Sequence, residues 1–206
     1  MCTNSEQQAT HATYLVIGAG TAGLSFIDSL LTLDAEATVI LVDRNSHAGG
    51  HWVHSYPFVR LHQTACNYGV NSLPLSKIID KKGNEKFSHD LASGKEILEY
   101  YKVVVEQFRA CGRVQLYFNC EYSQDESGNH IVTNTDDKQI TRVTCKKIVK
   151  VHTNVLVPSM RDGPPFPVDS SINYAPLNEL PTHITSKHYK KYVVIGAGKT
   201  GCDAIT

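Results

Sequence analysis

The sequence predicts an α/β fold in which a parallel sheet carries helices and an antiparallel β-meander, followed by the start of a second unit of the same kind. Two observations in the first part of the chain support this: buried apolar runs alternate with a helical pattern, and several short strands follow. A third is a Val/Ile run ending in glycine that recurs near the C-terminus. A chain of 206 residues has room for one full domain and part of a second.

The first unit is predicted to be a βαβ arrangement. Residues 13–18 form an apolar, β-rich run that ends in glycine, as in a fully buried parallel strand. Residues 22–33 place leucine and isoleucine at helical intervals, and residues 38–43 form a second buried strand.

A second helix is predicted after a long polar segment. Residues 44–76 are rich in glycine and histidine, and residues 81–86 are expected to form an exposed turn. Ser93 and Glu96 have the spacing of a capping box. The apolar face of the helix that follows is expected to comprise Ile97, Leu98, Tyr101, Val104, Val105 and Phe108.

Beyond Gly112 the pattern changes to short strands. These strands are predicted at residues 114–118, 129–133, 140–145 and 147–151, and together they resemble an antiparallel meander. Six prolines at positions 158 to 181 then favour an extended connector. Residues 192–196 repeat the opening strand.

Charge and composition exclude several function classes. Twenty basic and twenty acidic side chains give no net charge, which argues against general attraction to nucleic acid. No apolar run approaches the length of a membrane span, and the polar N-terminus has no signal pattern, so we expect a soluble, cytoplasmic protein. The six cysteines form no CxxC pair, which predicts reduced, mainly buried thiols rather than a zinc site or redox dithiol.

The first glycine motif is Gly18-Ala-Gly20-Thr-Ala-Gly23. It follows a predicted strand and opens a predicted helix, and Asp43 ends the next strand about 20 residues later. Such glycines permit a tight turn, close approach to a pyrophosphate and helix packing, while the acid accepts hydrogen bonds from a ribose. This context predicts dinucleotide binding.

A second motif, Gly196-Ala-Gly198-Lys-Thr-Gly201, also follows a Val/Ile run. A Walker loop would need a glycine where the sequence has Val193, so the Gly-Lys-Thr triplet does not indicate one. A second dinucleotide turn is favoured. Lys199 is placed to add charge near a phosphate, although a solvated first-turn lysine is the alternative.

Other candidate sites have simpler explanations. His47, His51 and His54 have helical spacing for a metal, but Gly49 and Gly50 oppose a helix there, so no metal site is predicted. His51 could instead help to shape a cofactor pocket or be a hydrogen-bonded loop histidine. Trp52 could be a cofactor partner or a packed aromatic, and Cys66 is expected to be a packed thiol.

The order of these motifs resembles the flavin-containing monooxygenase-like branch of the flavoproteins with two dinucleotide-binding domains. It consists of the first fingerprint, Asp43-Arg44, Gly49-Gly50-His51-Trp52, a proline-rich connector and the second fingerprint. Residues 56–63 and 68–72 look closest to predicted FAD/NAD(P)-binding oxidoreductases of bacteria and fungi. The likeness extends over residues 12–206.

The resemblance implies specific roles for individual residues. Gly18, Gly20, Thr21, Ala22 and Gly23 would line the FAD pyrophosphate, Asp43 would hold the adenosine ribose, and Arg44 would border the adenine. Gly50 and Trp52 would lie beside the ribityl chain and flavin, with His62 and Gln63 near the isoalloxazine and the backbone near Tyr122 at the adenine. Gly196, Gly198, Lys199, Thr200 and Gly201 would bind NADP, or NAD.

The sequence also departs from its nearest families. The connector of monooxygenases proper carries an FxGxxxH-type signature, which residues 157–166 lack, so oxygenation is in doubt while reduction of flavin by a nicotinamide is less so. Disulfide reductases of the superfamily place a cysteine pair beside the flavin, and the sequence has none. A single-domain dehydrogenase is disfavoured by the meander and the second fingerprint.

The predicted domains follow from these assignments. Residues 1–11 form a polar tail, 12–157 an FAD-binding domain, 158–189 the connector, and 190–206 the first strand and glycine turn of a truncated NAD(P)-binding domain. We therefore expect an N-terminal fragment of an FAD-dependent NAD(P)H oxidoreductase that passes electrons to oxygen or an organic acceptor. The alternative is a catalytically silent FAD-binding module or a truncated gene product. Substrate and catalytic residues are not predicted.

Overall fold

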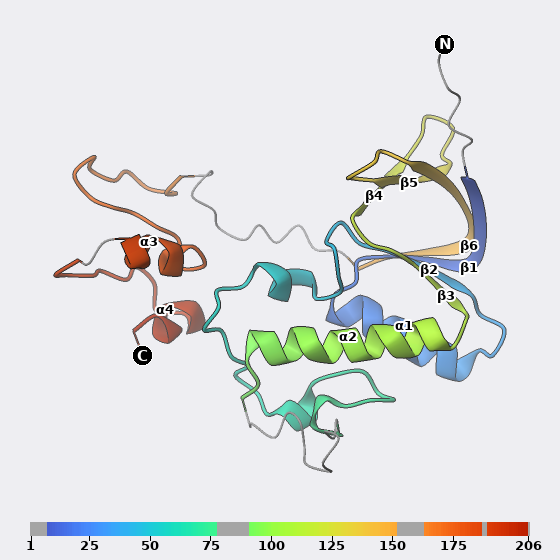
Figure 1. The fold of residues 1–206 in the computed structure, drawn as a ribbon, viewed down its shortest axis with the longest axis horizontal. Coiled ribbons are helices and arrows are strands. Elements are labelled where there is room, and N and C mark those ends of the chain that lie inside the picture. Colours follow the sequence, from blue (N-terminus) through green and yellow to red (C-terminus); the bar gives the residue numbers. More distant parts are fainter. Residues whose placement is uncertain (1–7, 78–90, 152–162, 187–188, 206) are drawn as a thin grey trace.

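A computed structural model describes residues 8–77, 91–151, 163–186 and 189–205 (Figure 1). The predicted turn at 81–86 and the start of the connector lie outside these ranges. The strands are β1 (Gln8–Ile17), β2 (Val39–Val42), β3 (Val114–Tyr117), β4 (Cys120–Gln124), β5 (His130–Asn134) and β6 (Ile140–Lys150). The α-helices are α1 (Thr21–Leu33), α2 (Gly94–Ala110), α3 (Leu180–Ser186) and α4 (Lys199–Asp203), and the 3-10 turns are η1 (Gly50–His54), η2 (Ala65–Asn67) and η3 (Leu75–Lys77).

The strands form one sheet in the order β3-β2-β1-β6-β5-β4. Strands β3, β2, β1 and β6 run parallel, whereas β4, β5 and β6 pair antiparallel. The predicted α/β class, with a parallel sheet and a meander, is therefore confirmed. Assigning residues 114–118 to the meander was wrong, because β3 pairs in parallel with β2, and β4 was missed.

The edges of the parallel sheet also differ from the prediction. Strand β1 begins at Gln8, so residues 8–11 are not part of a polar tail. They are held in the sheet by parallel pairing with β6, where Gln8 is opposite Thr141. The two strands predicted at 140–145 and 147–151 are one continuous strand, since β1 pairs along nearly its whole length.

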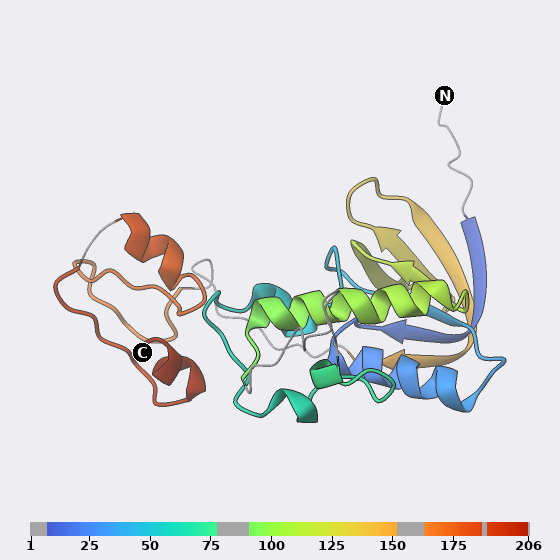
Figure 2. The ribbon, with the colours of Figure 1, turned by 60° about the horizontal axis from the view of Figure 1, so that its bottom comes forward.

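Two hydrophobic cores lie on opposite faces of the parallel strands. Successive side chains of a strand point to opposite faces. Val16 and Leu41 belong to the core shared with α1 and α2, whereas Leu15 and Ile40 belong to the core shared with the meander. Figures 1 and 2 show α1 and α2 side by side on one face, with β4 and β5 curling over the other.

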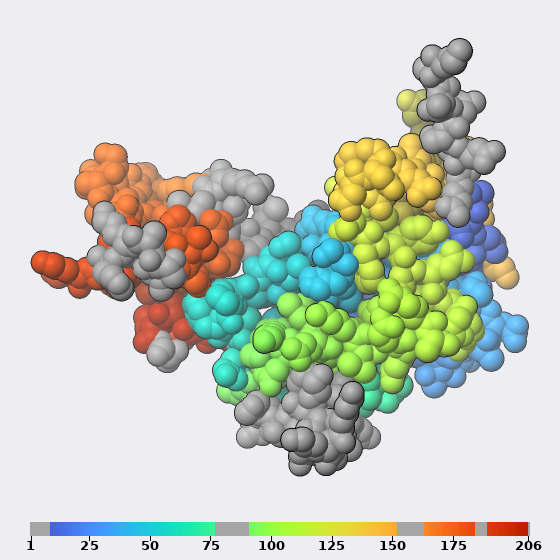
Figure 3. All heavy atoms as spheres, viewed as in Figure 1, coloured from blue at the N-terminus to red at the C-terminus, as the bar shows by residue number. Residues whose placement is uncertain are grey.

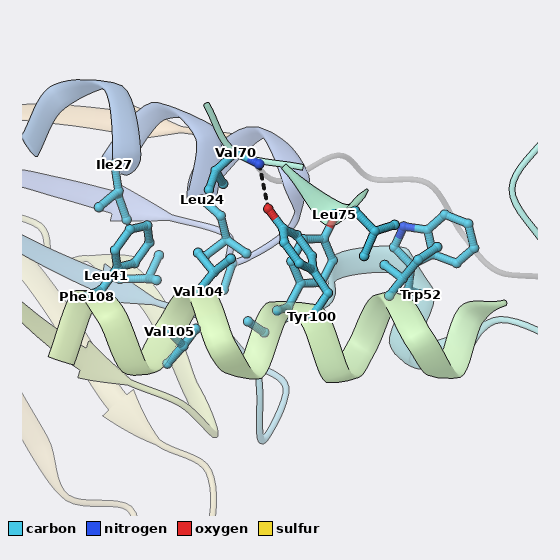
Figure 4. Close-up of a cluster of buried hydrophobic side chains, with 14 of the residues drawn as sticks. Leu24, Ile27, Leu41, Trp52, Val70, Leu75, Tyr100, Val104, Val105 and Phe108 are labelled. Carbon is cyan, nitrogen blue, oxygen red and sulfur yellow. Dashed lines mark hydrogen bonds between the residues drawn. The ribbon is translucent and has the colours of Figure 1, made fainter. Parts of the chain in front are cut away.

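Helix α2 begins as its sequence predicts. The Ser93 hydroxyl accepts from the Glu96 N–H (3.3 Å), and the Glu96 carboxylate accepts from the Ser93 N–H (2.7 Å), which completes the capping box. Its apolar face packs on α1 and the sheet (Figure 4). Tyr100, absent from the predicted face, is fully buried and accepts a hydrogen bond from the Val70 N–H (2.6 Å).

The C-terminal segment differs from the prediction in two places: a helix lies within the connector, and the strand predicted at residues 192–196 is not formed. Helix α3 lies within the predicted extended connector; Pro181 is tolerated because it is in the first turn, where an N–H is not needed. Residues 192–195 belong to no strand, because among the described residues no neighbour forms ladder hydrogen bonds with them. The space-filling view shows this orange-to-red segment beside residues of the cyan region that follows β2 (Figure 3).

Two composition-based expectations can be compared with the described residues. None of their helices is both long and apolar enough to cross a membrane. The expectation of mainly buried thiols was wrong: of the five described cysteines, all free, only Cys120 is buried, and Cys66, Cys111 and Cys202 are exposed. They lie at turns and helix ends, where local packing rather than residue type sets the exposure.

Candidate functional site

The first glycine turn joins β1 to α1 at the carboxyl end of the parallel sheet. Gly18 has a φ of 110° and donates its N–H to the Val42 carbonyl (2.9 Å), so the turn is fastened to β2. A Cβ on Gly23 would lie 2.0 Å from the Gly18 carbonyl oxygen. Only glycine therefore allows this close approach of helix and strand.

Asp43 lies directly after β2 and connects the two strand ends. It is buried, with 8% exposed. One carboxylate oxygen accepts the Ala19 N–H (2.6 Å) and the other accepts the Asn45 N–H (2.8 Å). The acidic residue of the motif is thus in direct contact with the glycine turn, and each oxygen keeps a lone pair for another donor.

The Gly49-Gly50 segment packs against the same turn. Gly49 donates its N–H to the Ala19 carbonyl (2.9 Å). Gly50 has a φ of 56°, and a Cβ on it would lie 2.9 Å from the Gly20 Cα. Two glycine backbones from distant parts of the sequence therefore meet where a side chain on either would intrude.

The loop between β3 and β4 lies beside Asp43. The Cys120 N–H donates to the Asp43 carbonyl (3.0 Å), and the Asn119 N–H donates to the Asn45 carbonyl (2.9 Å). Arg44 is exposed at this position. The Tyr122 side chain is engaged elsewhere, since its hydroxyl is 3.0 Å from His130 Nδ1.

A cluster of hydroxyl groups, which the sequence did not predict, adjoins the start of α1. The Thr21 hydroxyl is 2.9 Å from the Tyr68 hydroxyl and 2.5 Å from that of Tyr101, and the two tyrosine hydroxyls are 2.6 Å apart. The Trp52 indole N–H donates to Tyr68 (2.7 Å). Burial raises the pKa of Tyr101 far above its ordinary value. Tyr101 was predicted only as part of an apolar face, and its sequence pattern gave no sign of its polar contact.

The loop that carries Tyr68 is fixed by other buried polar groups. Asp28 on α1, 5% exposed, accepts the Ser72 N–H (3.0 Å) and the Ser72 hydroxyl. The Tyr100 hydroxyl donates to the Leu73 carbonyl (2.7 Å), and burial raises the pKa of Tyr100 to about 12. The loop is thereby anchored to both helices.

The second glycine turn repeats the local geometry of the first. Gly196 has a φ of 121°, and a Cβ on Gly201 would lie 2.4 Å from the Gly196 carbonyl oxygen. Lys199 pairs with Asp203 across one turn of α4. Burial tends to raise the pKa of Asp203, but hydrogen bonds from Lys199 and Tyr56 lower it below its ordinary value.

Tyr56 connects this second turn to the first region. Its hydroxyl donates to Asp203 (2.7 Å), and it also contacts Thr200. Burial raises the pKa of Tyr56, and the hydrogen bond to Asp203 adds to the effect. The Asp203 carboxylate thus has two partners, Tyr56 and Lys199, and Lys199 is in an ion pair in this structure.

The remaining predicted site residues are exposed at the surface. Ala22 is exposed in the first turn of α1, and His62 and Gln63 are exposed in the segment that follows η1. Partial burial lowers the pKa of His51, whose ring lies tilted by 34° against Trp52 with centroids 4.9 Å apart. His54 Nε2 is instead 2.8 Å from the Asn45 side-chain oxygen, and within the described ranges no group of three His, Cys, Asp or Glu is placed to hold a metal.

An apolar groove lies away from both glycine turns. It has a volume of about 550 Å³ between α1 and β6, and its lining residues include Phe26, Leu30 and Ile148. None of the residues of either glycine turn lines it. The groove is therefore not the candidate site.

The first glycine turn has the chemistry of an anion site. Gly20 is the N-cap of α1, and no side chain caps the helix or places an acid in its first turn. Helix N-termini present unpaired N–H groups and a positive dipole end, which favour phosphate. The glycine cradle, Asp43 and the Gly50 contact together fit a dinucleotide with a pyrophosphate at this position.

Sequence comparison finds relatives in mycobacteria. The chain is 38% identical over 192 residues to uncharacterized protein Rv2000 of Mycobacterium tuberculosis and equally to uncharacterized protein Mb2023 of Mycobacterium bovis. The match covers 92% of this chain and 34% of each relative, so the chain spans about a third of their length. No protein-family model matches.

Structure comparison finds the same fold in several solved oxidoreductases. An oxidized steroid monooxygenase bound to NADP matches with a TM-score of 0.51 and 24% identity, over 73% of this chain and 28% of that one. Polycyclic ketone monooxygenase of Thermothelomyces thermophila matches at 0.52 (18% identity; 73% and 24%), and the bacillithiol disulfide reductase Bdr of Staphylococcus aureus at 0.53 (14%; 75% and 44%). The chain therefore has a Rossmann-like fold shared with monooxygenases and a disulfide reductase.

Proposed function

We propose that this chain provides the FAD-binding unit of an NAD(P)H-dependent flavoprotein oxidoreductase of the monooxygenase-like type. The observation that carries this proposal is the assembly around the first glycine turn. Asp43 contacts Ala19, and Gly50 packs on Gly20, at the carboxyl end of the parallel strands. Dinucleotides bind at this edge of open α/β sheets, where the strand order reverses.

The residues would divide the cofactor among them according to its chemistry. The N–H groups at the start of α1, with Thr21, would hold the pyrophosphate, and Asp43 would accept from the adenosine ribose. The loop beside Arg44 and Asn119 would border the adenine, and Trp52 with residues 62–63 would face the flavin end. When bound, FAD supplies the capacity to accept hydride and pass on electrons.

The second glycine turn is proposed to bind the pyrophosphate of NADP or NAD. Its geometry repeats that of the first turn, and this supports the assignment. Lys199 is paired with Asp203, and its ammonium group has further N–H donors that could contact a phosphate. The domain division at residues 157–158 and 189–190 is part of this proposal.

The decisive experiment is a cofactor titration of the purified chain. We expect FAD to bind with a dissociation constant that calorimetry can measure, and the bound flavin to show its oxidised absorbance bands. Anaerobic addition of NADPH then tests hydride transfer, because reduced flavin loses those bands. A chain that binds no FAD would refute the proposal.

Asp43→Asn and Asp125→Asn form a matched pair for this titration. Both aspartates accept backbone N–H groups, but Asp125 does so in the exposed turn between β4 and β5. We expect Asp43→Asn to weaken FAD binding at least tenfold and Asp125→Asn to leave it unchanged. Circular dichroism of both variants checks that the fold is retained.

A second candidate function is an FAD-binding module that takes no hydride. The observation in its favour is that residues 192–195 pair with no strand among the described residues. The side chains of Val193 and Ile195 are 86% and 71% exposed. A nicotinamide-binding turn is normally supported by a paired strand. Flavin that binds but does not bleach with NADPH would favour this second function over the first.

A further inference from the structure

The hydroxyl cluster beside the first glycine turn has a directional hydrogen-bond order. Four protons are available to it, one on the Trp52 indole nitrogen and one on each of the Thr21, Tyr68 and Tyr101 hydroxyls. An indole N–H can only donate, so Tyr68 accepts from Trp52. The order of the other three protons determines what Thr21 can offer to a ligand.

Only one order keeps both short contacts when Thr21 donates outward. If Tyr68 donates to Tyr101 and Tyr101 donates to Thr21, the contacts at 2.6 and 2.5 Å are retained. The Thr21 proton then closes the ring on Tyr68 across the longest edge, 2.9 Å, or turns to an acceptor outside the cluster. In the reverse order, Thr21 donates to Tyr101, so an outward turn of the Thr21 proton would break the shortest contact, at 2.5 Å.

The cluster joins elements that are distant in sequence. Thr21 is the first residue of α1, Trp52 lies in η1 after Gly50, and Tyr101 lies in α2. Tyr101 is fully buried and Trp52 is 8% exposed, so water competes weakly for their polar groups. A change at Thr21 is therefore transmitted to the indole through the Tyr68 hydroxyl, which contacts both groups.

We propose that Trp52, Tyr68 and Tyr101 are positioning residues that aim the Thr21 hydroxyl at a bound nucleotide diphosphate. This inference rests on the proposed function of the first glycine turn. An anion at the start of α1 accepts the Thr21 proton, the Thr21–Tyr68 edge opens, and Tyr68 is left with the indole as its sole donor within the cluster. The indole environment thereby reports whether the site is filled.

The test uses ADP, which carries the diphosphate without the flavin that would quench indole fluorescence. Trp52 is the single tryptophan of the chain, so its emission can be assigned without ambiguity. We expect ADP to shift the wild-type emission, and this shift to be lost in Tyr68→Phe. An unchanged shift in Tyr68→Phe would overturn the proposal.

A double-mutant cycle separates positioning from general stability. We expect Tyr101→Phe to weaken ADP binding about fivefold, as for one lost neutral hydrogen bond, and Thr21→Val about tenfold. In the Thr21→Val background, Tyr101→Phe should add less than about twofold, because it acts through Thr21. A full fivefold effect in that background, or none in the wild type, would contradict the proposal.

Tyr14→Phe is the control, because it removes the same hydroxyl group from a tyrosine outside the cluster. The Tyr14 ring contacts Phe26 and Lys147. We expect this variant to retain the emission shift. If the wild-type chain binds neither FAD nor ADP, the proposed function fails; if it binds both and Tyr101→Phe binds ADP equally well, only the positioning role fails.

Discussion

The two glycine turns of the chain have nearly the same backbone in different surroundings. Gly18 and Gly196 have φ angles of 110° and 121°, and each turn brings a later glycine against the carbonyl of its first. The strand before the first turn is buried and paired on both sides, with Leu15 fully buried. Residues 192–195, before the second turn, pair with no strand among the described residues, and Val193 is 86% exposed.

This difference separates what a turn needs from what a strand needs. A GxGxxG turn is closed by contacts between residues a few positions apart, so the same motif gives the same backbone conformation in both places. A strand requires hydrogen bonds from a neighbour, and β1 has two neighbours, β2 and β6. The following changes should break or sharpen the contrast, beginning with the largest.

Alanine in the last glycine of each turn should have unequal effects. Gly23→Ala places a Cβ 2.0 Å from a backbone oxygen held in the paired sheet, and we expect a loss of about 3 kcal/mol of unfolding free energy. Gly201→Ala makes a similar clash at 2.4 Å, but the unpaired segment can shift, so we expect less than about 1 kcal/mol. Urea denaturation measures both, and equal losses would disprove the contrast.

Removing the charge of Asp43 tests the hydrogen bonds by which this carboxylate joins the end of β2 to the first glycine turn. The carboxylate accepts two backbone N–H groups at a buried position, and the amide of Asp43→Asn can accept through only one of its two polar atoms. We expect a loss of about 2 kcal/mol, as for hydrogen bonds to a charged group. Thermal unfolding without cofactor measures it, with Asp125→Asn as the control.

A hydroxyl in each strand segment tests the burial difference directly. Val16→Thr places a hydroxyl at a fully buried position, which we expect to cost about 1 to 2 kcal/mol. Val193→Thr makes the same chemical change at an exposed position and should stay within about 0.5 kcal/mol of the wild type. Denaturant midpoints of the two variants provide the comparison, and a larger loss for Val193→Thr would be inconsistent with it.

Acid should loosen α4 by protonating Asp203, the partner of Lys199. The pKa of Asp203 is lower in the folded chain, so its contribution is present above the ordinary value of 3.8 and is lost as the pH falls below it. We expect an effect below about 1 kcal/mol, since the Lys199–Asp203 pair is partly exposed. The protection of the α4 amides against hydrogen exchange, relative to the intrinsic exchange rate at each pH, should fall at low pH, and Asp203→Asn should remove that dependence.

The sequence predicted the parts of the site that are local in the chain. The first turn, α1 and the capping box of α2 each depend on residues within about four positions of one another. Strand β3 was misassigned because its sequence gives no sign of whether its neighbour is parallel. The hydroxyl of Tyr101 was missed because an amphipathic pattern records only that a side chain faces inward.

The sequence by itself determined two glycine turns, their strand-like preceding runs and the helices that follow them, because turn and helix geometry arise from neighbouring residues. Only the tertiary structure decided which of those runs became a strand, that Asp43 and Gly50 meet the first turn, and that Tyr68 and Tyr101 reach Thr21. These outcomes depend on contacts between residues far apart in the chain, which burial and hydrogen-bond satisfaction select only when the whole sheet is assembled.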